Sequence, residues 1–194
     1  RAKTFTFMFA LRILPLMKKW IALLRGINVG GNNILPMKDL RSLLGELGYS
    51  DVKTYIQSGN CVFETAETDS SIISGKITKA IEAQFSFAPP VFVLFVDDFN
   101  SVIDANPYAQ NAEINPKSVH IFFLWEPAQP DKMEALLSLS KPSERIALTK
   151  RALYLHAPEG IGRSKLAANI ERKLGVSITA RNYNSVMKIA KLAE

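Results

Sequence analysis

The sequence predicts an α+β protein built from two tandem ferredoxin-like (αβ-plait) halves and a C-terminal helix. Two observations lead to this fold class. Strand-like and helix-like runs follow one another in the order β-α-β-β-α-β, and the same order begins again after a polar link bordered by prolines. The chain length of 194 residues also suits two domains of about 90 residues each. The repeat lies in the order of the elements and not in residue identity.

The first half is expected to span residues 17–106. Its elements are, in order, a strand at 20–24, a helix at 36–47, strands at 52–57 and 61–63, a helix at 73–85 and a strand at 91–96. The first helix has leucines at helical spacing and a terminal stop at Gly48. The two middle strands alternate around a Gly/Asn turn, which is typical of a hairpin. Residues 69–71 offer caps for the second helix, and Pro89 and Pro90 end it.

A polar link at 107–117 is the expected domain boundary, and the second half is expected to cover 118–194. Its elements are, in order, a strand at 119–125, a helix at 130–139, strands at 145–149 and 152–156, a helix at 166–174 and a strand at 176–179. The last piece, 183–193, has apolar residues at helical spacing and is expected to form a terminal helix. Asn182 or Asn184 could cap this helix.

Residues 1–16 are expected to be an extension outside the fold. This segment is basic and apolar, but it lacks the small-residue cleavage site of a signal peptide. Arg12 and Pro15 interrupt its apolar run, and Met17 looks like a natural start. No other stretch approaches the roughly eighteen apolar residues of a membrane span, so no membrane partner is expected.

The chain carries 24 Lys and Arg residues against 18 Asp and Glu residues, a net charge of +6. A basic balance favours anionic partners such as phosphates, nucleotides or nucleic acid, although a merely basic surface is an equally good reading. The one cysteine, Cys61, excludes an intramolecular disulfide, fits a reducing compartment and is expected to be a core thiol. His120 and His156 lie apart, so no usual metal-ligand spacing is present and no cofactor can be named.

The most distinctive stretch is the loop at 25–33, which reads Arg-Gly-Ile-Asn-Val-Gly-Gly-Asn-Asn. Such a loop makes a tight bend or lets a ligand approach the backbone. Because strand directions alternate, the turn at 58–60 should emerge at the same end of the sheet. The following helix N-terminus would favour an anion there. The candidate ligand-binding residues of this half are Arg25, Asn28, Gly30, Gly31, Asn33, Ser58, Gly59 and Asn60.

The loop at 160–165, Gly-Ile-Gly-Arg-Ser-Lys, leads into a helix and should share a sheet end with residues 180–182. It could cradle a phosphate, although neither Walker nor dinucleotide spacing is present. The candidate residues of this half are Arg163, Ser164, Lys165, Arg181, Asn182 and Lys188. Simpler readings are a tight turn capped by Ser164, a hairpin turn at 58–60, a strand-end salt bridge for Arg25, and solvated charges for Lys165 and Lys188.

A family resemblance rests on five runs: Leu-Arg-Gly-Ile-Asn-Val-Gly-Gly at 24–31, Thr-Tyr-Ile-Gln-Ser-Gly-Asn at 54–60, Val-Phe at 62–63, Gly-Arg-Ser-Lys-Leu at 162–166 and Arg-Asn-Tyr-Asn-Ser-Val-Met-Lys at 181–188. They resemble the bacterial family catalogued as domain of unknown function 1697. That family usually has Arg-Asn-Trp-x-Thr-Val in the last run, so Tyr183 and Ser185 are mild departures. The resemblance covers residues 17–194. It implies a cytoplasmic, two-part αβ-plait protein and no activity, because the family has no established one.

Three functions fit these features. The first is binding of a phosphate-bearing small molecule, a nucleotide or phosphorylated metabolite, at the two loops, which would face each other near the domain junction. The second is nucleic-acid binding through a basic face, with Tyr55 as the evident stacking aromatic of the first half. The third is a structural or interaction module in which the loops only join the halves. No catalytic constellation is readable, so a reaction would rest on positioning and electrostatic stabilisation.

Overall fold

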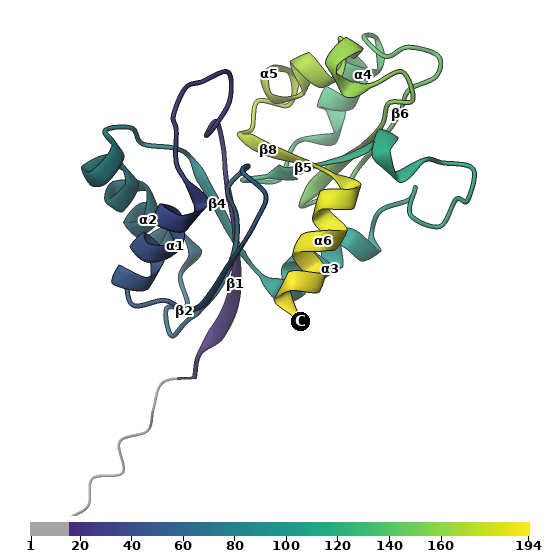
Figure 1. Cartoon of the computed structure of the whole chain (residues 1–194). Coiled ribbons are helices and arrows are strands. Elements are labelled where there is room, and N and C mark those ends of the chain that lie inside the picture. Colours follow the sequence, from purple (N-terminus) through teal and green to yellow (C-terminus); the bar gives the residue numbers. More distant parts are fainter. Residues whose placement is uncertain (1–15) are drawn as a thin grey trace, which may run out of the picture.

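The first half is a four-stranded antiparallel sheet with two helices on one face (Figure 1). The structure is a computed structural model that describes residues 16–194. The elements of this half are β1 (Lys18–Leu24), α1 (Met37–Glu46), β2 (Ser50–Tyr55), β3 (Asn60–Thr65), α2 (Ser70–Phe85), β4 (Val91–Phe95) and α3 (Val96–Asp104). The strand order is β2-β3-β1-β4, with every neighbouring pair antiparallel.

The second half repeats this arrangement. Its elements are β5 (Val119–Leu124), α4 (Met133–Leu137), β6 (Arg145–Leu148), β7 (Ala152–His156), α5 (Ile170–Leu174), β8 (Ile178–Asn182) and α6 (Tyr183–Ala193). Short 3-10 helices lie at Pro116–Ser118, Pro130–Lys132, Ile161–Arg163 and Ala167–Asn169. The strand order β6-β7-β5-β8 corresponds position by position to that of the first half. The predicted α+β class, with two sheets and a C-terminal helix, is confirmed.

The helix starts that the sequence marked most clearly are confirmed. The carboxylate of Asp69 accepts a 2.8 Å hydrogen bond from the backbone N–H of Ser71 at the start of α2. At the start of α6 the amide oxygen of Asn182 accepts one of 3.0 Å from the N–H of Asn184. Each cap satisfies a backbone donor that has no partner inside its helix, so the boundary falls where the capping residue stands.

The helix predicted at 166–174 is only partly confirmed, because α5 begins at Ile170. The side-chain amide of Asn169 donates to the carbonyl of Lys165, at 2.8 Å, where an α-helix would place the backbone N–H of Asn169. That N–H bonds Leu166 instead, which is the 3-10 pattern. Asparagine competes with its own backbone in this way, so the first turn is 3-10 and the α-helix starts late.

Two further predictions in the second half are corrected. The helix predicted at 130–139 is a 3-10 turn followed by the five-residue α4. The strand predicted at 176–179 is β8 at 178–182, since Gly175 ends α5 in the left-handed conformation and two extended residues follow. Arg181 therefore lies inside β8, opposite Ile121, and not in a loop that leaves the sheet.

Three apolar clusters hold the molecule together. One lies under α1 and α2, and includes Trp20, Leu40 and Phe63. Another lies under α4 and α5. The third, called the shared core below, lies between the two sheets with α3 and α6, which Figure 1 shows side by side between the halves. It includes Ile21, Leu23, Phe99, Ile121, Phe123, Tyr154, Val186 and Ile189. The hydroxyl of Tyr154 donates to the carbonyl of Val102 across it, at 2.8 Å.

The remaining predictions about organisation concern the ends and the link. The boundary at 107–117 stays a prediction, because the halves on either side of it share a core. The predicted extension lies outside the described residues, except for Leu16. Within the described part of the chain, no helix has the length and hydropathy needed to cross a membrane.

Candidate functional site

The glycine-rich loop at 25–33 is closed by its own asparagines. The side-chain amide of Asn28 donates to the carbonyls of Leu35 (2.9 Å) and Gln57 (2.8 Å), and its oxygen accepts from the N–H of Leu35 (2.8 Å). The amide of Asn33 donates to the carbonyl of Gly26 at 2.9 Å. The bond to Gln57 fastens the loop to the β2–β3 turn, as strand direction predicts. Gly30 and Gly31 lie exposed at its tip.

The turn at 58–60 packs directly against this loop. The carbonyl of Gly59 accepts a 2.8 Å hydrogen bond from the N–H of Leu24, at the end of β1. The fully buried side chain of Asn60 donates to the carbonyl of Tyr55 (3.1 Å) and to the hydroxyl of Ser58 (2.8 Å). The amide therefore fixes the hairpin from inside, which agrees with the alternative that residues 58–60 are simply a hairpin turn.

Arg181 reaches from β8 into the first half and joins the two halves. Its guanidinium donates to Asn60 Oδ1 (2.5 Å), Leu24 O (2.7 Å), Ser58 O (3.1 Å), Ala180 O (2.8 Å) and Thr179 Oγ1 (3.0 Å). A guanidinium has five N–H groups, so no donor of Arg181 is left for a ligand. Burial without a carboxylate partner lowers the pKa of this side chain to about 10, and it stays charged at neutral pH.

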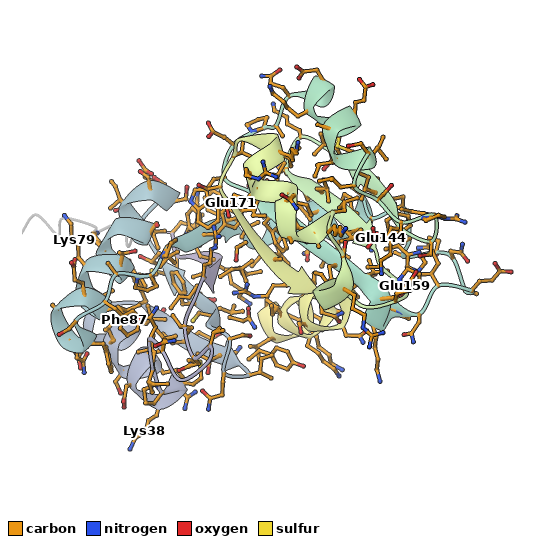
Figure 2. The ribbon with its side chains drawn as sticks, turned by 90° about the horizontal axis from the view of Figure 1, so that it is seen from above. Lys38, Lys79, Phe87, Glu144, Glu159 and Glu171 are labelled. Atoms are coloured by element: carbon orange, nitrogen blue, oxygen red, sulfur yellow. The ribbon has the colours of Figure 1, made fainter. Side chains whose placement is uncertain are left out.

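Arg25 makes a second link between the halves. Its guanidinium forms a two-pronged ion pair with the carboxylate of Glu171 in α5, with both N···O distances 2.6 Å, and also donates to the carbonyl of Ile178 at 3.1 Å. The hydrogen bonds from Arg25 lower the pKa of Glu171, and the same contact raises that of Arg25. Figure 2 shows Glu171 at the side of the second half that meets the first. Arg25 therefore forms a salt bridge at the end of its strand, which was the alternative to a role in ligand binding.

The loop at 160–165 makes no hydrogen bond or ion pair to residues 25–33 in the described structure. It follows Glu159, which binds Lys141 (2.7 Å) and Ser143 (2.6 Å) at the end of the second half away from the first (Figure 2). Ser164 is buried, and its hydroxyl accepts from Ala167 N–H at 2.9 Å, as a turn-capping serine would. The described residues thus show no direct polar contact between the two loops, and that they face each other stays a prediction. The polar contacts of the first-half loops with the second half go to Glu171 in α5 and to Arg181 in β8.

The other candidate residues have ordinary surroundings. Arg163, Lys165 and Lys188 are exposed on the surface of the second half. The amide of Asn182 donates to the carbonyl of Lys117 at 2.8 Å. Tyr55 is half-buried beside the shared core, and α6 packs across β2 and β3, so this sheet face is covered and does not offer Tyr55 as a base-stacking platform.

The cysteine lies where the sequence predicts it, in the core. Cys61 is fully buried and burial raises the pKa of its thiol to about 12, so it is a core thiol and not a nucleophile. Burial also lowers the pKa of His120 and of His156. Across residues 16–194, no three His, Cys, Asp or Glu side chains lie together in a way that would hold a metal ion.

A groove of about 700 Å³ separates the halves along β4. One wall is the start of α2, and the other is the end of β5 with the β6–β7 turn. Phe92 and Trp125 both line it, with ring centroids 4.8 Å apart, and Trp125 is 37% exposed. The sequence contained the signals, a tryptophan at a strand end and the pair Lys150-Arg151 in a hairpin turn. Only the packing of the halves brings them together.

The formal charges that line the groove cancel. Arg151 is paired with Asp98 at 3.1 Å, and Lys150 and Glu126 are exposed at the rim. No ion pair of Lys150 or Glu126 is present among the described residues. Lys150 is therefore the cation that a negative group of a bound ligand would meet.

Comparison with known proteins agrees with this architecture. Residues 17–154 match a family described as "Protein of unknown function (DUF1697)". The chain belongs to this family. The solved structure of "conserved bacterial protein SP0830 from Streptococcus pneumoniae" is similar to this DUF1697 protein, with a TM-score of 0.68 and 24% sequence identity over 92% of this chain and 100% of that one. At that identity the likeness shows the fold alone. No curated protein matches the chain.

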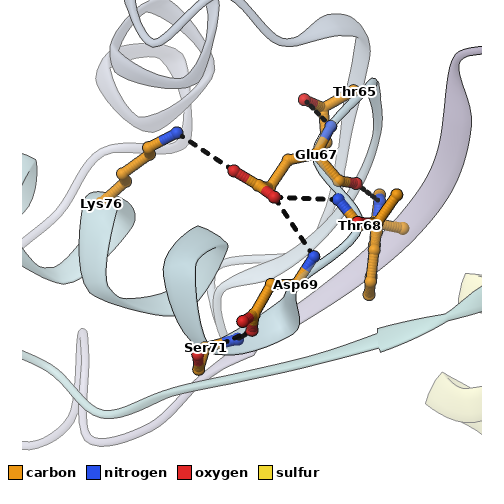
Figure 3. A network of polar contacts seen from close by, with 7 residues as sticks. Thr65, Glu67, Thr68, Asp69, Ser71 and Lys76 are labelled. Atoms are coloured by element: carbon orange, nitrogen blue, oxygen red, sulfur yellow. Dashed lines mark hydrogen bonds and ion pairs between the residues drawn. The ribbon is translucent and has the colours of Figure 1, made fainter. Parts of the chain in front are cut away.

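A polar network fixes the groove wall that precedes α2 in this DUF1697 protein (Figure 3). The carboxylate of Glu67 accepts from the N–H groups of Thr68 (3.0 Å) and Asp69 (3.3 Å) and pairs with Lys76 at 3.5 Å. The indole N–H of Trp20 donates to the carbonyl of Glu67 at 3.2 Å. The hydrogen bonds from Asp69 and Thr68 lower the pKa of Glu67, because they stabilise its charged form.

The Glu67 network should make the free energy of unfolding depend on pH in the acid range. A carboxyl whose pKa is lower in the folded state stabilises the fold fully above its unfolded pKa, here 4.5, and loses that contribution as the pH falls through the folded value. We expect Glu67→Gln to be less stable than the wild type at pH 7, with the difference shrinking below pH 4.5. Urea unfolding at pH 7, 4.5 and 3.5 measures this, with Glu134→Gln, on the exposed face of α4, as the control. A difference that is constant with pH would contradict it.

Proposed function

We propose that this protein is a binding module whose ligand occupies the groove between its halves. The observation that carries this proposal is the groove itself, a hollow of about 700 Å³ at the junction whose lining includes the exposed Trp125. Ligand pockets have volumes of about 300–1,000 Å³, favour domain junctions and are mostly apolar with a few polar groups. The aromatic pair supplies apolar contact area, and Lys150 supplies one charged contact.

The proposed ligand carries a negative group, as the sequence led us to expect, but we place it at the groove and not at the loops. The side chains of Arg25, Asn28, Asn60 and Arg181 use their hydrogen bonds on the fold. Among the described residues, the ammonium group of Lys150 makes no hydrogen bond or ion pair. A contact with Arg163, Lys165 or Lys188 stays a prediction, and so does a nucleotide or phosphorylated metabolite as the ligand.

We also infer that each half is a ferredoxin-like αβ-plait. The β-α-β-β-α-β order, with the first and third strands of each half central and antiparallel, supports this. In that arrangement β4 and β8 are edge strands, which matters for the groove because β4 runs along it.

Tryptophan fluorescence tests the proposed groove directly. Both tryptophans of the chain, Trp20 and Trp125, line the groove, but Trp20 is only 1% exposed, against 37% for Trp125. We expect a ligand found by thermal-shift screening to change the emission of the wild type, and Trp125→Phe to remove most of that change, because the remaining Trp20 is almost fully buried. Lys150→Ala should weaken an anionic ligand about five- to tenfold.

A matched control separates the groove from the second-half loop. Arg163→Ala removes an exposed cation from residues 160–165 and should leave affinity unchanged. Weakening by Arg163→Ala but not by Lys150→Ala would move the site to the loop. A panel of nucleotides, sugar phosphates and organic acids that gives neither stabilisation nor an emission change would favour the purely structural module. A salt-dependent response to single-stranded oligonucleotides alone would favour nucleic-acid binding.

A further inference from the structure

We infer that the ligand of this groove is a short peptide that adds to the free edge of β4 as an extra strand. This inference rests on the groove being the binding site, as proposed above, and it names the class of ligand. The peptide is extended, mainly apolar, and carries one acidic side chain. Four observations support it: the hydrogen-bond pattern of β4, the extent of the groove along this strand, its charge and the aromatic pair that lines it.

β4 pairs with β1 on one side only. The N–H of Arg25 donates to the carbonyl of Pro90 at 2.9 Å, which fixes the alternation along this ladder. In an antiparallel pair every second residue bonds to the neighbouring strand, so Phe92 and Leu94, two and four residues after Pro90, bond to β1. The backbone groups of Val91 and Val93 must then point away from β1, toward the open edge. The hydroxyl of Ser74 confirms this direction, since it donates to the carbonyl of Val91 at 2.7 Å.

Val93 is the centre of the open edge. It lines the groove, and the alternation of the β1–β4 ladder leaves its backbone N–H and C=O on the side of β4 that has no strand partner. The unpaired edge of a strand is a ready template for pairing with another extended chain. An extended backbone offers both complementary groups at the right spacing, which a sugar phosphate does not.

The groove follows the whole length of β4. All five residues of β4 line it, which is a length of about 17 Å at 3.4 Å per residue. Ser70, Ser71 and Ser74 of α2 form one wall, and Trp125 with the β6–β7 turn forms the other. A strand edge beside a helix is an arrangement that captures extended peptides, with backbone hydrogen bonds for affinity and side-chain pockets for specificity.

The charge of the groove selects against a polyanion. Two carboxylates, Asp98 and Glu126, line it together with two cations, Lys150 and Arg151, and Arg151 is already paired with Asp98. A triphosphate placed near Lys150 would also meet Glu126. A peptide with a single Glu or Asp gains the contact with Lys150 and keeps the rest of its surface apolar for Phe92 and Trp125.

The experiment uses blocked pentapeptides with alternating Val or Phe residues and a single Glu, added to the full chain. We expect some members of this library to change Trp125 emission and to slow hydrogen exchange at the Val93 amide at least tenfold. The same peptides with their alternate amides N-methylated should bind at least tenfold more weakly, because the side chains are kept and the backbone donors are lost. Replacing the Glu by Gln should weaken wild-type binding but not that of Lys150→Ala.

The outcomes separate this inference from the proposed function. If nucleotides or sugar phosphates change Trp125 emission and no peptide does, the inference of a peptide ligand is wrong, while the groove is still the binding site. If no probe of any class changes the emission, both are wrong. Equal binding of the N-methylated peptides, or unchanged exchange at Val93, overturns strand addition even where a peptide binds. Val93→Pro, which removes the edge N–H, gives an independent reading if circular dichroism shows that it folds.

Discussion

Replacing Arg181 by methionine should lower the free energy of unfolding by about 3–5 kcal/mol. The guanidinium satisfies Asn60, Leu24 and Ser58 of the first half, and methionine fills a similar space without a single donor. Buried acceptors that lose their partner cost about 1–3 kcal/mol each, which exceeds what is regained by removing a buried charge. Arg181→Lys should also be destabilised, because one ammonium group cannot reach acceptors spread around a planar fork.

Equilibrium unfolding in urea measures this loss. The matched control is Arg163→Met, the same exchange at an exposed arginine, which should stay within about 0.5 kcal/mol of the wild type. A loss at Arg181 below about 1 kcal/mol would mean that water replaces the guanidinium and that the halves do not depend on it. The same variant should leave Trp125 emission at native pH close to that of the wild type, since Arg181 does not line the groove.

Gly59→Ala should be the most damaging of the glycine substitutions, with a loss of about 2–4 kcal/mol. A Cβ there would lie 2.6 Å from the Cβ of Leu24 and 2.7 Å from the Cδ1 of Ile27. Leu24 is fixed in β1 and cannot withdraw without distorting the strand. Gly59 also has a φ of 69°, which an alanine adopts only at a cost.

Gly31→Ala isolates the two causes. Gly31 has a φ of 79°, but nothing lies within 4 Å of its added Cβ. We expect a loss of about 1–2 kcal/mol there, the cost of the left-handed backbone alone. Thermal or urea unfolding of both variants gives the steric part by difference. Equal losses at the two positions would show that the contact with Leu24 relaxes freely.

Local patterns predicted the elements well where one force dominates. The caps Asp69 and Asn182 placed two helix starts, and alternating strand direction placed the 25–33 loop beside the 58–60 turn. Where a side chain competes with the backbone, prediction was poorer. The side-chain amide of Asn169 occupies the carbonyl of Lys165, which the helix would have used, and the spacing of apolar residues does not reveal this competition.

The candidate site was harder to predict for a different reason. Arginines and asparagines in glycine-rich loops fit a ligand or a neighbouring part of the chain equally well, and only tertiary packing decides which. Arg25 found Glu171 some 146 positions away, and Arg181 found Asn60 across 121. The groove at Trp125 arises only when the halves pack together, so no single segment predicts it.

The shared core has a consequence for how such a chain could change over evolutionary time. Each sheet buries one face under its own helices and the other against its neighbour. A half excised at the link would present Ile21 and Leu23, or Ile121 and Phe123, to water as an apolar surface prone to aggregation. Although they look alike in strand order, the halves are therefore not interchangeable units. Recombination that swapped one of them would succeed only if the incoming half matched the old partner's inner face, so the two inner faces should change together.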